Sequence, residues 1–352
     1  MKRISAVICE LNPLHDGHRY VFSRAREKSD ILIAVMSGNF VQRGESAVYD
    51  KYRRAEAALG AGADIVLELP FPYSSSSAEF FAAAGVRIAE KAGADALYFG
   101  SECGDIAALR KAGAVLSGEE YKEAMTVGRS AALRSQALRS LCPELPSSLF
   151  ESPNDILGAE YCRRASIETV AVKRISTESA SAIRKRCIGS GSDMLDPARL
   201  LQLEYCRFRT LREPVSGIAE CGGGVFERLY NTALQHAGAE EWFNAVRTKQ
   251  YTDSRLRRAA LFALCSVRSE EMKEDVLFTN LLAAGERGRE YLSALKKESD
   301  FPIIANHSEK KYLEEGARRQ VALADFADNI YALCEERDDP SYYIRRPPVI
   351  TR

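Results

Sequence analysis

The same tetrapeptide, Ala-Gly-Ala-Asp, occurs twice in the first hundred residues, at 61–64 and 92–95, each time between a helix-like stretch and a short apolar run. Glycine can take the left-handed conformation that ends a helix, so both copies are typical of a junction from helix to strand. The repeat predicts consecutive β–α units. A chain built from such units folds into a parallel sheet with right-handed crossovers.

Short apolar runs supply the predicted strands, and they read as strands buried on both faces. They lie at residues 4–11, 31–36, 64–69 and 95–99, with helix-like stretches between them at 17–29, 50–60 and 77–91. A further strand candidate at 169–175 follows a mainly helical stretch and leads into a helix at 180–187. The predicted fold class is α/β, a doubly wound, Rossmann-like parallel sheet.

The second half of the chain has a different pattern. Gly189-Ser190-Gly191-Ser192, followed by Asp196-Pro197, is the strongest linker signal in the sequence. Beyond it, apolar positions three and four apart predict helices at 198–207, 225–246, 255–267 and 276–296. We therefore expect an ATP-binding catalytic domain over 1–190 and an all-helical domain over 191–352.

The overall charge excludes some classes of protein. The 49 basic residues balance the 49 acidic residues, which argues against a protein that coats nucleic acid or membrane by bulk attraction.

None of the nine cysteines falls at Cys-x-x-Cys spacing, so we expect reduced thiols in a cytosolic protein. With no signal peptide and no membrane-spanning run, the predicted location is the cytoplasm.

Two of the four histidines, His15 and His18, follow the first strand where a helix begins. The segment reads Asn12-Pro13-Leu14-His15-Asp16-Gly17-His18. Free backbone N–H groups and the helix dipole favour an anion there. Gly17 would let the backbone approach a phosphate without a Cβ in the way, and two imidazoles could contact phosphate oxygens. The arrangement predicts a nucleotide site.

The sequence allows two other interpretations of the histidine pair. Both side chains could be helix caps or a fortuitous surface cluster, but the position after a strand and Asn12-Pro13 favours the nucleotide site. Zinc is rejected because no third Cys, His or carboxylate lies at ligand spacing, and Glu10 would be on the strand.

Six ordered motifs give the chain a specific resemblance. They are ICELNPLHDGH (8–18), MSGNFVQRGE (36–45), ADIVLELPFPYSSSSAEFF (63–81), ALYFGSE (96–102), PNDILG (153–158) and SASAIRK (179–185). In this order they resemble the tRNA(Met) cytidine acetate ligase family of the H-x-G-H nucleotidyltransferase superfamily. The match is dense over the first 190 residues and thinner beyond, through 251–264 and 285–305.

The resemblance implies an ATP site, with Mg2+, in which His15 and His18 are catalytic. The implied contacts with ATP are Ile8, Cys9, Glu10, Leu11, Asn12, Pro13, Leu14, His15, Asp16, Gly17, His18, Gly100, Asn154, Arg174 and Ile175. Gly100 ends a strand, where parallel sheets bind ligands. Without the resemblance, Gly100 could be an ordinary strand end, Asn154 a helix N-cap, and Arg174 and Arg184 solvated surface residues.

Basic residues gather in two stretches of this neutral chain. Residues 163–187 hold seven basic and two acidic residues, and residues 247–258 hold five and one. Together they could track RNA phosphates, with Tyr251 and Trp242 available to stack on unpaired bases. For the second stretch, a solvated helix face is an equally good interpretation.

The resemblance implies an ATP-dependent ligase that activates acetate as acetyl-adenylate and acetylates N4 of the wobble cytidine of elongator tRNA(Met). Two alternatives are a small-molecule nucleotidyltransferase, passing AMP or CMP to a phosphorylated metabolite, and a catalytically silent nucleotide- or RNA-binding protein. The helical domain with its basic stretches disfavours the first alternative.

One stretch departs from the family pattern. There, a Gly-x-x-Tyr-His-Asp segment and a loop separate the strand equivalent to 170–175 from the Ser-Ala-Ser/Thr-x-Ile-Arg helix. Here only Ser176-Thr177-Glu178 intervene. We expect either a change in acceptor recognition or a divergent member with another carboxylate or another target, while the ATP half is less affected.

Overall fold

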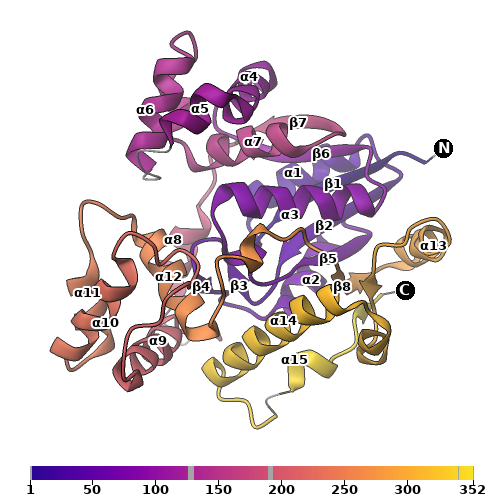
Figure 1. The fold of residues 1–352 in the computed structure, drawn as a ribbon. Helices are drawn as coiled ribbons and strands as arrows, with labels where there is room; N and C mark the ends of the chain where they lie inside the picture. Colours follow the sequence, from indigo (N-terminus) through magenta and orange to yellow (C-terminus); the bar gives the residue numbers. More distant parts are fainter. Residues whose placement is uncertain (1, 126–130, 189–192, 340, 352) are drawn as a thin grey trace.

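An eight-stranded sheet forms the centre of the computed structural model, which describes residues 2–125, 131–188, 193–339 and 341–351 (Figure 1). The strand order is β10-β8-β5-β2-β1-β6-β7, and β9 pairs with β8. The bounds are β1 (Ile4–Cys9), β2 (Ile31–Ser37), β5 (Ile65–Leu69), β6 (Ala96–Ser101), β7 (Glu168–Lys173), β8 (Thr279–Ala284), β9 (Ile303–Ile304) and β10 (Val349–Ile350). A separate hairpin consists of β3 (Phe40–Val41) and β4 (Glu45–Ser46).

The five central strands are parallel. β1 pairs with β2 on one side and with β6 on the other, and the sheet continues to β5 and β7. Because the strand order reverses at β1, the carboxyl ends of β1 and β6 flank the point where doubly wound sheets bind ligands. The predicted α/β class and its five predicted strands are confirmed.

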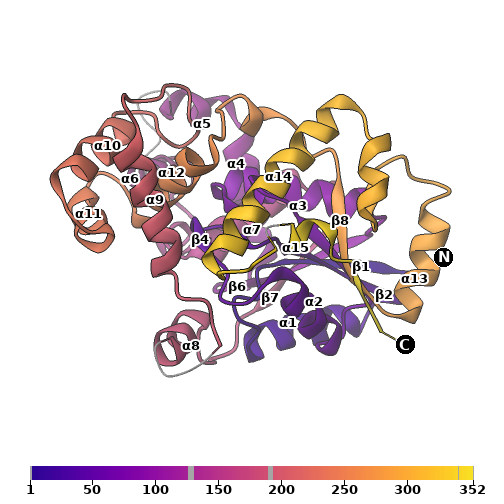
Figure 2. The same ribbon diagram turned by 90° about the horizontal axis from the view of Figure 1, so that it is seen from below.

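Helices cover both faces of the sheet (Figure 2). α1 (Asp16–Arg26) and α2 (Lys51–Gly60) lie on one face, and α3 (Ala78–Lys91) and α7 (Pro153–Arg164) lie on the other. The remaining helices are α4 (Ile106–Ser117), α5 (Glu119–Ala124), α6 (Ala131–Leu141), α8 (Ala180–Cys187), α9 (Ala198–Thr210), α10 (Val225–Gln235), α11 (Ala239–Val246), α12 (Asp253–Cys265), α13 (Glu286–Leu295), α14 (Glu315–Cys334) and α15 (Tyr342–Arg345).

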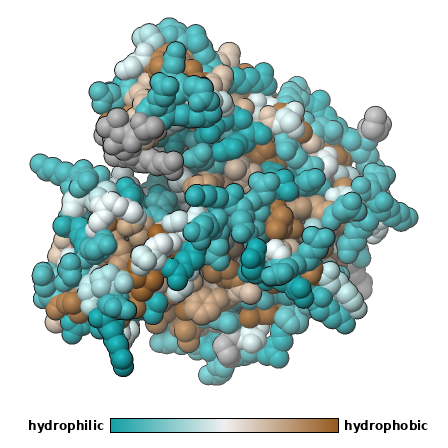
Figure 3. Space-filling model, in the orientation of Figure 1, coloured by the Kyte–Doolittle hydropathy of each residue, from teal (hydrophilic) through white to brown (hydrophobic). Residues whose placement is uncertain are grey.

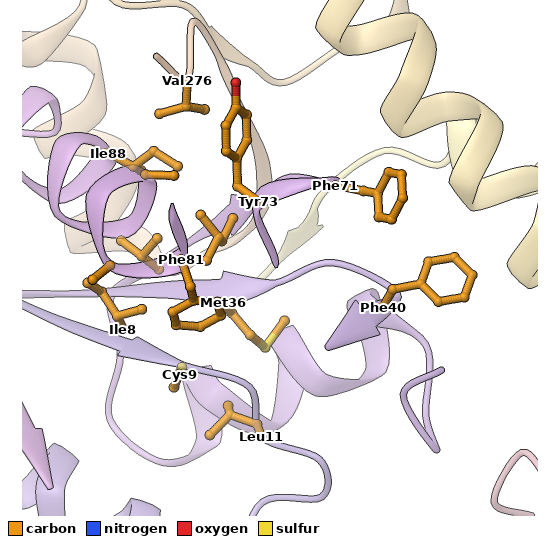
Figure 4. Packing of buried hydrophobic residues seen from close by; sticks show 14 of the residues in the cluster. Ile8, Cys9, Leu11, Met36, Phe40, Phe71, Tyr73, Phe81, Ile88 and Val276 are labelled. Carbon is orange, nitrogen blue, oxygen red and sulfur yellow. The ribbon is translucent and has the colours of Figure 1, made fainter. Parts of the chain in front are cut away.

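The core lies between the sheet and these helices. All residues of β1, β2 and β5 are buried, as their continuous apolar runs predict. Figure 4 shows Ile8, Met36 and Phe81 packed together from β1, β2 and α3. α3 approaches closely because Gly85 has no side chain; a Cβ there would lie 2.8 Å from Ile8 Cδ1.

The helical prediction for the second half is partly wrong. Helices do form at α9, α10, α11 and α12, but residues 276–296, predicted as one helix, contain β8 followed by α13. β8 pairs antiparallel with β5 and so extends the main sheet. A short buried apolar run is compatible with both a strand and a helix, so the spacing of its apolar residues does not distinguish the two. The predicted boundary at residue 190 falls within 189–192, outside the described residues, and the division into 1–190 and 191–352 stays a prediction.

A buried charge cluster fastens α14 to the sheet. Lys51 Nζ on α2 lies 2.9 Å from Glu68 Oε1 on β5 and 2.6 Å from Asp328 Oδ2 on α14, and all three side chains are buried. The amides of Asn39 and Asn280 donate to the two carboxylates, at 2.9 and 2.7 Å. Burial raises the pKa of Asp328 to about 6, although Lys51 acts to lower it. One lysine thus holds two carboxylates in the interior.

The exterior is mostly hydrophilic on the face drawn in Figure 3, with hydrophobic side chains in scattered places. Within the described ranges, no helix has both the length and the apolar character needed to cross a membrane. Burial raises the pKa of the Cys9 and Cys334 thiols to about 12, so both stay protonated at neutral pH.

Candidate functional site

A buried arginine fixes the loop that follows β1. Arg54 on α2 donates to the carbonyl oxygens of Glu10, at 2.7 Å, and Ser37, at 3.0 Å, which lie at the ends of β1 and β2. Burial lowers the pKa of Arg54, and backbone carbonyls take the place of water around it. Residues 10–18, here called the histidine loop, therefore start from a rigid position at the carboxyl edge of the sheet.

Only part of the predicted ATP segment has side chains free to meet a ligand. Ile8, Cys9 and Leu11 are buried in the core, as Figure 4 shows, so these three residues could contact a nucleotide only through their backbone. Asn12 is also buried, and its Oδ1 accepts a hydrogen bond from the N–H of Val48 at 2.8 Å. These residues hold the loop in place.

His15 and His18 together cap α1. His15 Nδ1 accepts from the N–H of Gly17 at 3.0 Å, and His18 Nδ1 accepts from the N–H of His15 at 3.3 Å. This reciprocal pattern is a capping box made from two imidazoles. Because Nδ1 accepts in both rings, each neutral ring carries its proton on Nε2, which remains able to donate to a ligand. The cap interpretation and the ligand interpretation are therefore compatible.

Both imidazoles are held neutral. Burial lowers the pKa of His18 to about 3, with His15 and Arg174 as further causes. Burial also lowers the pKa of His15, and Arg174 adds to the effect. The pair therefore offers two N–H donors and no fixed charge at neutral pH, an arrangement suited to charge that develops during a reaction.

The expectation of free N–H groups at the start of α1 is partly wrong. The N–H of Gly17 is taken by the ring of His15, and the N–H of His18 donates to the His15 carbonyl oxygen at 2.9 Å. Gly17 is required for a different reason from the predicted one: a Cβ there would lie 2.8 Å from His15 Cε1. The imidazole Nε2 atoms, and not these backbone N–H groups, are therefore the donors that this segment leaves without a hydrogen bond to any described residue.

A second group of polar side chains lies at the end of β6. Glu102 Oε1 accepts from Asn154 Nδ2 at 2.6 Å and from Arg174 Nη1 at 2.9 Å. Asn154 is the second residue of α7, so the alternative interpretation of this residue as an N-cap is wrong, and its contact with ATP stays a prediction. Asp155 anchors α7 here by accepting from the N–H groups of Glu102, at 2.9 Å, and Cys103, at 3.2 Å.

Gly100 lies on β6 two residues before Glu102, and Ile175 directly follows Arg174. A Cβ on Gly100 would meet only Arg174 Cγ at 3.6 Å and Val21 Cγ2 at 3.7 Å, which are ordinary contacts. The packing therefore does not demand glycine at this position. Ile175 is 42% exposed, an apolar side chain left open beside Arg174.

The structure thus brings the predicted residues Asn154 and Arg174 together, and it adds three that were not predicted: Glu102, Arg54 and Thr177. Glu102 stands in the ALYFGSE motif, and an acid directly after a strand end was the signal available for it. Arg54 carried no signal, since its partners are backbone carbonyls. The shortened connection between β7 and α8 puts Thr177 Oγ1 3.3 Å from where a Cβ on Gly17 would be.

The basic stretch on α12 is largely neutralised. Glu220 lies 3.0 Å from Arg258 Nε and 3.8 Å from Arg255 Nε, and Glu45 lies 3.6 Å from Arg257 Nε. The prediction that Trp242 could stack on a base is wrong. Trp242 is fully buried and donates from Nε1 to the Leu229 carbonyl oxygen at 3.0 Å.

Most basic residues of the first stretch also form ion pairs. Arg163 and Arg164 bind Glu79, and Arg186 binds Glu178. Arg184 on α8 lies 3.9 Å from Glu45 Oε2 and also donates to the Asn12 carbonyl oxygen at 2.6 Å, which seats α8 on the histidine loop. Within the described ranges, no group of three or more His, Cys, Asp or Glu side chains could hold a metal ion.

Comparison with known proteins agrees with this geometry. The sequence model of the HIGH Nucleotidyl Transferase family matches residues 1–196 and 195–343. The chain is 32% identical to the tRNA(Met) cytidine acetate ligase of Syntrophotalea carbinolica, covering 87% of this chain and 85% of that protein. It is 33% identical to the enzyme of the same name from Exiguobacterium sibiricum, covering 92% and 94%.

The fold comparison covers almost the whole chain. The crystal structure of Thermotoga maritima TmcAL bound with alpha-thio ATP matches with a TM-score of 0.86 at 28% identity, over 99% of both chains. The apo form of the same protein also matches with a TM-score of 0.86. By sequence and by fold, this chain belongs to the tRNA(Met) cytidine acetate ligase family of HIGH nucleotidyltransferases.

Proposed function

We propose that this protein uses ATP to activate acetate as acetyl-adenylate and then acetylates N4 of the wobble cytidine in elongator tRNA(Met). The observation that carries the proposal is the neutral imidazole pair, with both Nε2–H groups available, at the switch point between β1 and β6. The names of the relatives, and the ATP analogue in the related crystal structure, support it.

In the first step, an acetate oxygen attacks the α-phosphorus of ATP and pyrophosphate leaves, giving acetyl-adenylate. His15 and His18 donate from Nε2 to phosphate oxygens on which negative charge grows. Their Nδ1 atoms accept backbone N–H bonds, so the rings need no reorientation as the charge develops. Arg174 is the cation beside the pair and can leave Glu102, because exposed ion pairs are weak.

In the second step, the N4 amine of the cytidine attacks the acetyl carbon of the mixed anhydride. AMP leaves, and the amine loses a proton. The protein's part in this step is to hold the two reactants together, which requires no covalent intermediate on the chain. The buried, protonated thiol of Cys9 is accordingly a core residue in this scheme.

The residues present fit Mg2+ carried by the nucleotide better than Mg2+ held in a protein cage. Magnesium usually keeps several waters and binds one or two carboxylates together with substrate phosphates. The acids of the site are Asp16, the exposed carboxylate beside His15, together with Glu102 and with Glu10 of the histidine loop. When bound, the ion neutralises phosphate charge.

Exchange of labelled pyrophosphate into ATP tests the first step, because exchange reports reversible adenylate formation. We expect exchange that requires acetate. Exchange that requires a phosphorylated metabolite instead would identify a small-molecule nucleotidyltransferase. Binding of ATP without exchange, under any acceptor, would identify a silent nucleotide-binding protein.

Mass spectrometry of nucleosides tests the second step. We expect N4-acetylcytidine in an elongator tRNA(Met) transcript incubated with the full chain, ATP and acetate, and none when the wobble cytidine is replaced by uridine. Acetate-dependent exchange without this product would support the formation of acetyl-adenylate and would contradict the proposed RNA target. That result would favour the divergent member that the missing Tyr-His-Asp segment allows.

A further inference from the structure

Four exposed basic side chains lie on the elements that converge on the histidine loop. They are Arg19 on α1, Arg43 in the β3–β4 hairpin, Lys173 at the end of β7 and Lys185 on α8. In the described part of the chain none of the four forms an ion pair, and we name them the rim cations.

A contact of its neighbour places Lys185 beside the histidine loop, and Lys173 stands at the end of β7, next to Gly104 in the turn after β6. Lys185 follows Arg184, which donates to the Asn12 carbonyl oxygen of the histidine loop at 2.6 Å. Lys173 precedes Arg174, whose charge acts on both histidine rings. Lys185 therefore adjoins the loop on α8, and Lys173 lies at the other end of the short connection between β7 and α8. Figure 2 shows α8, β7 and α1 along the same side of the molecule.

Arg43 and Arg19 are placed in the same way. The N–H of Gln42, the neighbour of Arg43, donates to Glu10 Oε1 at 2.7 Å, and the positive charge of Arg43 lowers the pKa of that carboxyl against the larger effect of burial. Arg19 directly follows His18 in the first turns of α1. Arg19, Arg43 and Lys185 thus belong to segments that touch or form the histidine loop, and Lys173 stands at the carboxyl end of β7 in the same sheet.

The arginines of α12 contrast with the rim cations. Arg255, Arg257 and Arg258 each lie near a glutamate, and Arg258 is only 12% exposed. Arg257 also covers the ring of Phe243, with its guanidinium carbon 4.6 Å from the ring centre. Arginines that are paired in this way hold the helices together, and their attraction for an external phosphate is weak because a carboxylate already balances their charge. Lys249 is the exposed lysine of that stretch.

We propose that the phosphate backbone of the RNA substrate docks on the rim cations, around the entrance to the ATP site, and not on α12. The inference rests on the proposed function, which makes the partner an RNA. Unpaired, exposed cations release bound counterions and attract a polyanion, whereas paired ones do so weakly. Docking around the loop also brings one unpaired base to the histidines, while the backbone on both sides of it remains bound.

Binding of a full-length elongator tRNA(Met) transcript to the full chain, measured over a range of KCl concentrations, tests the proposal. Lys173→Gln and Lys185→Gln are the test variants, singly and combined, and Lys249→Gln is the matched control. Each rim substitution should weaken binding about threefold to tenfold and lower the slope of log affinity against log salt by about one. The control should stay within about twofold of the wild type, and ATP affinity of Lys185→Gln should be unchanged.

Three results would overturn the proposal. If Lys249→Gln weakens RNA binding and the rim variants do not, the RNA-binding surface lies at α12 and not at the rim cations. Rim variants that lose ATP affinity and keep RNA affinity would assign the rim to the nucleotide's phosphates. Selective capture of an acidic protein, with no RNA binding by the wild type, would assign another partner. RNA binding that depends on the rim without acetyl transfer would instead reject the proposed function and keep this surface.

Discussion

The rings of His15 and His18 lie 3.9 Å apart, centre to centre, and each accepts a backbone N–H of the same helix start through Nδ1. One pair of side chains therefore serves the stability of α1 and the chemistry proposed for the site. Different substitutions can separate these two roles.

Replacing His15 separates capping from activity. His15→Ala removes a helix cap, which should lower the free energy of unfolding by about 1 kcal/mol. It also removes a donor to the growing phosphate charge, which should reduce acetate-dependent exchange by about 100-fold or more. His15→Asn, which can still cap, should recover the stability and not the exchange. Urea unfolding and exchange rates measure the two effects, and full exchange in His15→Ala would refute the catalytic role.

The stability that His18 confers should depend on pH. The unfolded chain binds a proton on His18 below about pH 6.5, but the folded protein keeps that ring neutral down to a pKa of about 3. Between these values the unfolded state holds more protons, so the free energy of unfolding falls as pH falls. The stability difference between wild type and His18→Asn should shrink by about 2 kcal/mol from pH 7 to pH 5. A constant difference in urea unfolding would contradict the neutral, buried ring.

Gly100→Ala tests whether a nucleotide lies against β6. The new Cβ meets no protein atom closer than 3.6 Å, so the variant should be as stable as the wild type. If ATP occupies the space beside Gly100, its affinity should fall about tenfold, the effect of a small steric clash. Gly60→Ala, with nothing within 4 Å of its Cβ, is the control for stability and binding alike. Isothermal titration gives the affinities, and an unchanged value for Gly100→Ala would remove this residue from the ATP site.

The buried cluster around Lys51 should respond unequally to the loss of its members. Lys51→Met leaves two carboxylates buried without their cation and should cost about 3–5 kcal/mol. Asp328→Asn keeps the Lys51–Glu68 pair and should cost less, about 1–2 kcal/mol. The folded-state pKa of Asp328, about 6, exceeds its unfolded value, so the folded state binds more protons below pH 6. The cost of Asp328→Asn should therefore be smaller at pH 8 than at pH 5 in urea unfolding, and equal costs would contradict the raised pKa.

The parallel sheet could be predicted because its strands are buried on both faces, and such runs are conspicuous in a sequence. β8 was mistaken for part of a helix because TNLLAA satisfies both patterns. The edge of β5 that β8 pairs with, more than two hundred residues earlier in the sequence, decides between strand and helix. The β3–β4 hairpin has two residues in each strand, too few to show any periodicity.

The position of the histidine loop between a strand and a helix can be predicted because the apolar run, the proline and the glycine stand in one short segment. What the sequence could not show was which hydrogen bonds the rings already make. A count of charges likewise could not reveal that Glu45 and Glu220, distant in sequence, would meet the arginines of α12. A local motif can be recognised in the sequence, but the pairing of surface charges depends on the tertiary structure.

The place of β8 in the sheet has a consequence during synthesis. When the ribosome has completed β7, the N–H and C=O groups along the outer edge of β5 have no partner, and Lys51 and Glu68 still lack Asp328. An open edge of this kind is a template for pairing with other chains. The nucleotide-binding sheet is thus protected against aggregation only after residues 279–284 and 328 have emerged, so a chaperone that shields β5 should matter most for chains interrupted between β7 and β8.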